Sequence, residues 1–282
     1  MSTKNWVASK IMQRCVLNIF DKVLYLDCGD EYILDIVLQN FGHFSSTELI
    51  GEKVDFHYNL KRDIETSVFS IVRNEDVHLE SNDLGMFVYQ LEKDITVKIQ
   101  HLCQSLFFMH GAALEKNGEI LLLTGRSGAG KSTTTWGLLN NGFNYLSDEL
   151  APINLDTMYV SPYPHAVCLK SHPPLYPLPE GILKTNRTMH IPVEQLPSKA
   201  HLESFPLTRV IIVEFSSDNA KPELTQLSQA EACINIYTNG LNQLAHDNDG
   251  LAAASKIASK CDCYTLAAAK LDETCELIKT LF

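Results

Sequence analysis

The chain has 282 residues, of which 45% are hydrophobic and 20% are charged, and its formal net charge is -11. This length permits one large domain with an appendage or two modest domains, each with its own core. The acidic balance, without clusters of lysine or arginine, argues against binding to nucleic acids or to anionic membranes.

The first part of the chain, residues 1–95, is predicted to form a small α+β region. Short strand-like runs, separated by charged or glycine-containing turns, lie at residues 16–26, 32–37 and 68–72. A further strand is predicted over 84–89 and a helix over 90–106, with the domain boundary between residues 92 and 97. The second region, residues 96–282, therefore begins inside this predicted helix.

A β-hairpin is predicted next. The apolar run 106–114 contains His110 and is followed by the polar turn 115–118 and by a second apolar run at 120–124. Taken alone, a histidine in such a run is typical of a hydrogen-bonded core residue.

The second run leads directly into a complete GxxxxGK[ST] sequence. Its residues are Gly125, Arg126, Ser127, Gly128, Ala129, Gly130, Lys131 and Ser132. In such a loop, glycines let backbone N–H groups surround a phosphate, the lysine reaches the terminal phosphates, and the hydroxyl ligates Mg²⁺. Residues 133–139 are predicted to begin a helix, whose N-terminus, including Thr133, favours the same anion. Strand, loop and helix together predict a nucleotide site.

An acidic pair, Asp148 and Glu149, follows a short predicted strand at 143–147. Only a short helix and a turn at 140–142 separate this strand from the phosphate loop, so we expect a right-handed crossover that sets it beside the loop strand. Both carboxylates would then lie near the nucleotide. One can complete the Mg²⁺ coordination and the other can accept a proton from an attacking hydroxyl.

The remaining elements of the second region are less regular. Residues 171–206 are rich in proline, lysine and serine and predict a long loop or flap over the site. A buried strand is predicted over 208–215, and helices are predicted over 228–244, 250–259 and 271–281. His246, Asp247 and Asp249 lie between two of these helices and are interpreted as polar turn residues.

These motifs together resemble a known family. His110-Gly111, the phosphate loop, the turn at Gly142 and the pair Asp148-Glu149 have the order and spacing of the catalytic core of HPr kinase/phosphorylase. The chain resembles the HPr-kinase-related kinases more closely. Some of these are encoded beside lasso-peptide biosynthesis, and they commonly read Ser-Asp-Glu where this chain has residues 147–149. The stretches 162–170 and 263–266 are also similar to that group.

The resemblance implies an α/β fold in which an HPr kinase C-terminal-like P-loop core follows the small α+β region. It implies that Asp148 is the catalytic base and that Glu149 and Ser132 are associated with the metal. His110 would lie near the transferring phosphate, and Lys131 would be the phosphate-loop lysine. Lys170, Arg187 and Arg209 are the cations that the resemblance places best for contact with phosphate or an acidic acceptor.

Some residues depart from the parent family. Thr133 stands where the parent has a glutamate, which weakens a second metal site. The signatures for HPr recognition and for the phosphorylase reaction are not visible, so neither HPr nor the reverse reaction is predicted. Arg126 is interpreted as an exposed loop residue.

We therefore expect an ATP- and Mg²⁺-dependent kinase that phosphorylates a hydroxyl, in first place a serine of a peptide or protein such as a ribosomal precursor peptide. Two alternatives stay open: a kinase of free serine or another metabolite, and a nucleotide-dependent sensor or peptide-binding module without catalysis. The parent family forms hexamers, and a homo-oligomer is compatible with this chain.

Cysteine spacing and hydropathy bear on the compartment. The eight cysteines contain no Cys-x-x-Cys pair, and reduced thiols are expected. No apolar run is long enough to cross a bilayer, and residues 1–6 lack the apolar core of a signal peptide. A cytoplasmic protein that does not contact membranes is expected.

Overall fold

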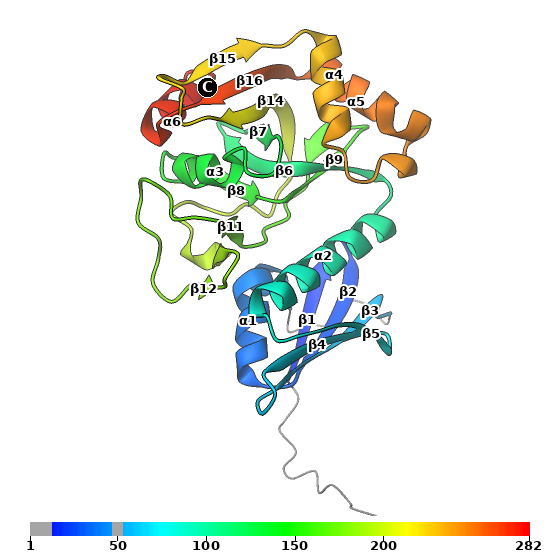
Figure 1. Cartoon of the computed structure of the whole chain (residues 1–282). Coiled ribbons are helices and arrows are strands. Elements are labelled where there is room, and N and C mark those ends of the chain that lie inside the picture. The colour runs from blue at the N-terminus through cyan, green and yellow to red at the C-terminus, as the bar shows by residue number, and fades with distance from the viewer. Residues whose placement is uncertain (1–12, 47–52) are drawn as a thin grey trace, which may run out of the picture. The chain divides into compact units, whose positions relative to one another are not determined.

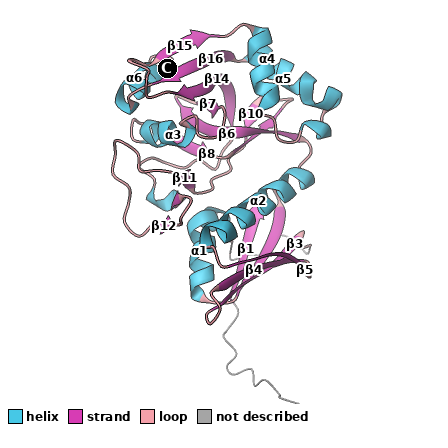
Figure 2. Cartoon of the chain, viewed as in Figure 1, coloured by secondary structure: helices cyan, strands magenta, loops and turns pink. Residues whose placement is uncertain are grey.

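The computed structural model describes residues 13–46 and 53–282 of the chain. Within these ranges the fold is mixed α/β, with six α-helices and three sheets. Figure 1 labels the elements along the chain, and Figure 2 shows helices and strands in both halves of it. The chain divides into two compact units, Met1–Ile95 and Thr96–Phe282.

Two expectations concern the N-terminus and membranes. Residues 1–6, examined above for a signal peptide, lie outside the described residues. Among the helices that the structure does describe, none is both long enough and apolar enough to cross a membrane.

The first unit is built on a five-stranded sheet whose spatial order follows the chain. Its strands are β1 (Gln13–Ile19), β2 (Lys22–Cys28), β3 (Phe56–Asp63), β4 (Val68–Arg73) and β5 (Asp76–Ser81). β2 and β3 are parallel, whereas the other neighbouring pairs are antiparallel. A parallel pair needs a crossover connection, and helix α1 (Glu31–Phe41) lies in it.

The strands predicted at 32–37 and 84–89 are wrong, because both segments are helical. Asp30 caps α1 by accepting a hydrogen bond from the Ile33 amide, and the buried residues Ile33, Ile36 and Val37 recur at helical spacing. Residues 84–89 form the first turns of helix α2 (Leu84–Leu102), which continues across the boundary between the two units.

The second unit is built on an eight-stranded sheet. Its order is β10-β9-β6-β7-β14-β16-β15, with β8 paired to β6. The strands are β6 (Leu106–Lys116), β7 (Glu119–Thr124), β8 (Asn144–Ser147), β9 (Leu150–Asn154), β10 (Tyr159–Val160), β14 (Phe205–Phe215), β15 (Glu223–Gln226) and β16 (Asp262–Ala268). The helices are α3 (Lys131–Leu139), α4 (Gln229–Thr238), α5 (Leu251–Lys260) and α6 (Leu271–Lys279).

The centre of this sheet consists of β7, β14 and β16, which run parallel to one another. Its two faces are covered by different helices, as Figure 1 shows. Leu121 and Leu123 of β7 pack in one core cluster with residues of α3 and α6. Ile120 and Leu122 pack in another with residues of α4 and α5. A parallel strand that is covered on both faces reads as a continuous apolar run, which is why β7 was recognisable in the sequence.

The predicted hairpin and the predicted strand at 208–215 are confirmed as β6–β7 and as part of β14. The neighbour of β8 was predicted wrongly, since β8 pairs with β6 and not with the loop strand β7. The tight turn at Asn117-Gly118 lets β6 pair with β7, so β6 takes the place beside β7 that was predicted for β8. The connection through α3 therefore passes over one strand before β8 joins the sheet.

The segment 171–206 is more structured than the predicted loop or flap. Its strands β12 (Leu183–Lys184) and β13 (Met189–Ile191) form a three-stranded sheet with β11 (Val167–Leu169). Ile182, Met189 and Ile191 are buried in the core cluster that contains Trp136. The apolar side chains in this segment are too widely spaced to show a period, which is why the sequence concealed the packing.

Candidate phosphate-binding site

The phosphate loop connects the end of β7 to the start of α3. Gly125, Gly128 and Gly130 all have positive φ values, of 139°, 84° and 93°, a region that side chains disfavour. A side chain on Gly125 would also meet the carbonyl oxygen of Val213 at 2.7 Å. The glycines are thus required by the backbone path. The first amides of α3 have no acceptor within the helix and can bind an anion.

Lys131 is buried and its ammonium group contacts the loop itself. Nζ donates hydrogen bonds to the carbonyl oxygens of Gly125, at 2.9 Å, and Arg126, at 3.2 Å. Burial lowers the pKa of Lys131, and the charges of Glu149 and Asp148 partly oppose this effect. The ammonium group therefore lies within the loop, where the phosphates of a nucleotide would be bound.

Asp148 follows β8 directly and is only 1% exposed. Its Oδ2 accepts a hydrogen bond from the Cys168 amide at 3.1 Å, whereas its buried Oδ1 has no hydrogen-bond partner among the described residues. Burial, with the charge of Glu149 second, raises the pKa of Asp148 to about 7, although the nearby Ser132 hydroxyl acts to lower it. The structure thus brings a buried carboxylate with a raised pKa next to the loop serine.

Glu149 has different surroundings from its neighbour. Its Oε2 lies 3.6 Å from His110 Nδ1, and its side chain is 47% exposed. Burial and the charge of Lys131 lower the pKa of His110, an effect that Glu149 partly offsets. Ser132 adjoins the Asp148 carboxylate. That Ser132 and Glu149 hold a magnesium ion stays a prediction.

The residue after His110, Gly111, lies where the adjacent strand leaves no room for a side chain. A Cβ atom at this position would lie 2.4 Å from the carbonyl oxygen of Leu123 on the adjacent strand. The Thr124 hydroxyl donates to the His110 carbonyl oxygen at 2.8 Å. This close approach fixes His110 directly beside the start of the phosphate loop.

Lys170 joins the site from the end of β11. Its exposed Nζ donates to the Ser127 hydroxyl at 2.7 Å, so this predicted cation does reach the phosphate loop. Arg187 lies elsewhere, in the turn between β12 and β13, where its amide donates to Thr185 Oγ1. Arg209 lies on β14 and forms an ion pair with Glu119. Arg126 is exposed on the loop, as expected, and Thr133 lies in the first turn of α3.

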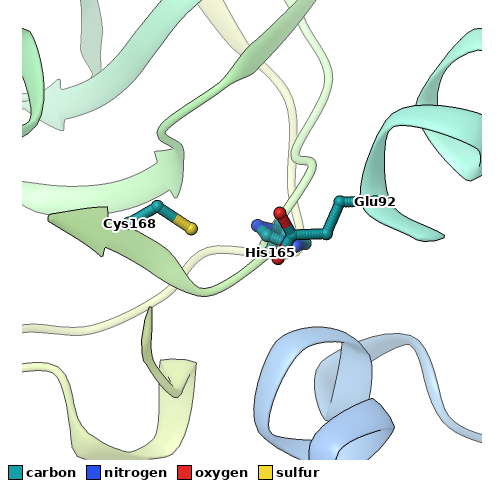
Figure 3. Close-up of side chains that lie close together, drawn as sticks. All are labelled: Glu92, His165 and Cys168. Atoms are coloured by element: carbon teal, nitrogen blue, oxygen red, sulfur yellow. The ribbon is translucent and has the colours of Figure 1, made fainter. Parts of the chain in front are cut away.

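Cys168 is a site residue that the sequence analysis missed. Besides its amide contact with Asp148, its Sγ lies 3.3 Å from His190 Nδ1, and His190 Nε2 lies 2.7 Å from Thr188 Oγ1. Figure 3 shows the Cys168 thiol together with His165 of the same segment. The strand β11 that holds Asp148 is therefore tied to β13. Only the position of Cys168 inside the stretch 162–170 could have pointed to it.

Comparisons with known proteins add no assignment. No family model matches the chain, and no curated protein matches its sequence.

Proposed function

We propose that the chain is an ATP- and Mg²⁺-dependent kinase that transfers the γ-phosphoryl group to a hydroxyl, in first place a serine of a peptide or protein. We further propose that Thr96–Phe282 is an HPr-kinase-like P-loop catalytic unit. The resemblance in motif order supports both proposals. The strand, loop and helix around Lys131 are the context that the motif requires.

The observation that carries the proposal is the buried carboxylate of Asp148. It lies beside Ser132 and has an oxygen, Oδ1, that no described residue satisfies. A buried polar atom without a partner costs free energy of about 1–3 kcal/mol, and an acceptor hydroxyl that donates a hydrogen bond to Oδ1 would remove this cost. A buried carboxylate next to the loop serine is placed to accept the proton of an acceptor hydroxyl, which is the role that a hydroxyl kinase requires.

The chain's own groups divide the work. The amides of the loop and the Lys131 ammonium group would bind the β- and γ-phosphates, and Lys170 would add a second positive charge at Ser127. The oxygens of Ser132 and Glu149 are of the kind that Mg²⁺ prefers, and a bound Mg²⁺ would neutralise phosphate charge. The negative charge of a bound nucleotide would raise the pKa of Lys131, which burial lowers, and would thus favour the protonated lysine.

Asp148 would accept the proton of the acceptor hydroxyl while the hydroxyl oxygen attacks the γ-phosphorus and ADP leaves. Its raised pKa of about 7 matches a general base that works near neutral pH. His110, whose pKa is lowered, is neutral at that pH and can donate or accept one hydrogen bond near the transferring group without adding charge. Glu149 acts on His110 through its charge and through a backbone hydrogen bond, and both oppose the lowering of the pKa.

A cytoplasmic location is part of the proposal. All eight cysteines are free thiols, which fits a reducing compartment that also supplies ATP and Mg²⁺. A homo-oligomer stays compatible with the chain.

The first test is mass spectrometry of the purified protein after incubation with Mg²⁺, ATP and a panel of acceptors. The panel holds peptides encoded by neighbouring genes, HPr and free serine. We expect one phosphoryl group on a peptide hydroxyl. Asp148→Asn should retain nucleotide binding but lose about 10²–10⁴-fold in transfer rate, since it removes the base. Lys131→Ala should weaken both binding and transfer.

Other outcomes would change the proposal. Phosphorylation of free serine alone would replace the peptide kinase by a metabolite kinase. Tight ATP binding with no modified acceptor would favour a sensor or peptide-binding module. An equal loss of ATP binding in Asp148→Asn would contradict the assignment of Asp148 as the base.

A further inference from the structure

The two sides of the phosphate loop differ in chemistry. On the side of β6 and β8 lie the acidic pair and His110. On the other side β7 pairs with β14, which pairs with β16, and these three parallel strands end at the same edge of the sheet (Figure 1). Ligands of α/β sheets bind outside the carboxyl ends of such strands.

The position of Asp148 limits where the γ-phosphate and the nucleoside of a bound nucleotide can lie. Transfer requires the γ-phosphate to be next to Asp148, which is reached from the β6 side of the loop. A phosphate chain that extends across the loop from there would run away from Asp148, toward β14. The nucleoside would leave the loop where β14 and β16 end.

Phe215 is the last residue of β14 and lies at this position. A Cβ atom on Gly130 would lie 3.2 Å from the Cβ atom of Phe215, so the phenyl side chain begins against the loop glycine that precedes α3. Phe215 is 53% exposed, although residues 210–213 of the same strand are buried. A single exposed apolar side chain is common on protein surfaces, and the contact with the loop is what distinguishes this one.

The residues that neighbour Phe215 on β16 have short side chains, and a hydrogen bond fixes the backbone there. Phe215 pairs with Ala268 of β16, and residues 267–269 are all alanines. The Asn219 amide group donates to the Ala268 carbonyl oxygen at 2.9 Å, which ties the turn after Phe215 to β16. The phenyl ring thus stands beside short side chains on a fixed backbone.

We propose that Phe215 is the platform on which the base of the bound nucleotide stacks. The inference rests on the proposed function, because it assumes that the loop binds a nucleoside triphosphate. Stacking on an aromatic ring uses the π-face that every base has, so Phe215 would add affinity without separating ATP from GTP. It would, however, separate a nucleotide from a phosphate chain that carries no base.

The test measures the binding of Mg-ATP, Mg-GTP and Mg-tripolyphosphate by isothermal titration calorimetry. Phe215→Ala should weaken ATP and GTP about 5- to 150-fold, the loss expected for one base–aromatic stack. Tripolyphosphate binding should change less than about twofold. Phe215→Trp, which keeps an aromatic ring at this position, should retain the binding of ATP and GTP.

The matched control is Leu202→Ala. Leu202 is 69% exposed and precedes β14, at the strand end opposite to Phe215. This variant should bind all three ligands as the wild type does. Thermal unfolding of each variant checks that the truncation leaves the fold intact.

The outcomes separate the inference from the proposed function. If Lys131→Ala loses both ATP and tripolyphosphate while Phe215→Ala loses neither, the nucleotide site stands and the stacking role is wrong. Equal weakening of ATP and tripolyphosphate by Phe215→Ala would mean that Phe215 only supports the loop, which also overturns the inference. If the wild type binds no ligand of the three, both proposals fail.

Discussion

At the scale of single residues, Asp148 and Glu149 show how neighbours in sequence acquire different properties. Asp148 is buried with its Oδ2 held by the Cys168 amide, whereas Glu149 is half exposed and faces His110. Burial disfavours the charged form, which is why the proposed function gives the proton-accepting role to Asp148. Glu149 keeps enough freedom to turn toward an ion at Ser132.

The division of roles predicts different defects for the two amide substitutions. Glu149→Gln should raise the Mg²⁺ concentration needed for half-maximal transfer, on the order of tenfold, the size of effect produced by losing one group that supports a metal. Transfer at saturating Mg²⁺ should largely recover. Titration of activity with Mg²⁺ at fixed ATP measures this shift.

Asp148→Asn provides the comparison, because it is isosteric and adjacent. It should lose transfer at every Mg²⁺ concentration. If instead Mg²⁺ rescues Asp148→Asn and fails to rescue Glu149→Gln, the two roles are exchanged, and the contact of Ser132 with Asp148 is part of the metal site.

At the scale of elements, the packing of α3 on α6 depends on Gly137. A Cβ atom there would lie 2.7 Å from both Cys275 Sγ and Leu271 Cδ1. Glycine costs a helix interior about 1 kcal/mol relative to alanine, whereas overpacking a core costs about 1–3 kcal/mol. The close packing of α3 on α6 therefore favours glycine at position 137 by more than the low helix propensity of glycine disfavours it.

Gly137→Ala should therefore lower the free energy of unfolding by about 1 kcal/mol, in spite of the better helix former. Urea denaturation measures the change. Cys275→Ala, which removes one of the two clashing atoms, should restore part of the loss in the double variant. A Gly137→Ala protein more stable than the wild type would show that α6 moves away without cost.

The elements that were predicted correctly are those that a short contiguous stretch of sequence specifies. The β6–β7 hairpin and the loop–helix junction are specified by a contiguous stretch, with Asn117-Gly118 and the phosphate-loop glycines at the turns. The run 32–37 is too short for its apolar pattern to separate strand from helix, and the cap at Asp30 decides it. The partner of β8 depends on which strand already occupies the place beside β7, which no local pattern records.

At the scale of the whole molecule, Glu115 links distant segments of the second unit. Its carboxylate accepts hydrogen bonds from Asn144 Nδ2 at 2.6 Å and from the Gly118 amide at 2.7 Å, and it lies 3.1 Å from His201 Nε2. Burial alone would raise the pKa of Glu115, but these partners together hold it below its ordinary value of 4.5. A carboxylate of this kind makes stability depend on pH.

The sign follows from the lowered pKa. The stabilisation by Glu115 is present above pH 4.5, the ordinary value, and is lost as the pH falls through the lower value of the folded state. The wild type should be more stable than Glu115→Gln at about pH 5.5, and this difference should shrink toward about pH 3.5. Urea denaturation of both proteins across this range measures it.

Glu223→Gln is the control, because Glu223 is exposed on β15 and should give no pH-dependent difference from the wild type. A constant gap between the wild type and Glu115→Gln at all pH values would contradict the prediction. It would mean that Glu115 acts through packing and not through its charge.

The candidate site was predictable where chemistry and sequence order coincide. Lys131, Ser132 and Asp148 could be named because motif spacing brings them together, and Lys170 because the resemblance placed it. Phe215 and Cys168 could not, since Phe215 approaches the loop and Cys168 approaches Asp148 only through the folding of segments far apart in the chain. Their side chains carry no signature that distinguishes them from ordinary core or surface residues.

Strand β6 changes partners along its length. One edge of β6 pairs with β9 from Leu106 to His110 and with β8 from Ala113 to Glu115, while the other edge pairs with β7 from Gly111 onward. His110 and Gly111 lie at this change, so the same dipeptide positions the candidate site and joins two parts of the sheet. A slip of one residue in β6 would turn His110 to the opposite face and place a side chain against Leu123. This clash disfavours molecules in which the phosphate loop is formed but His110 points to the wrong face of the sheet. The pairing of β6 with β7 therefore also selects the correct position of His110.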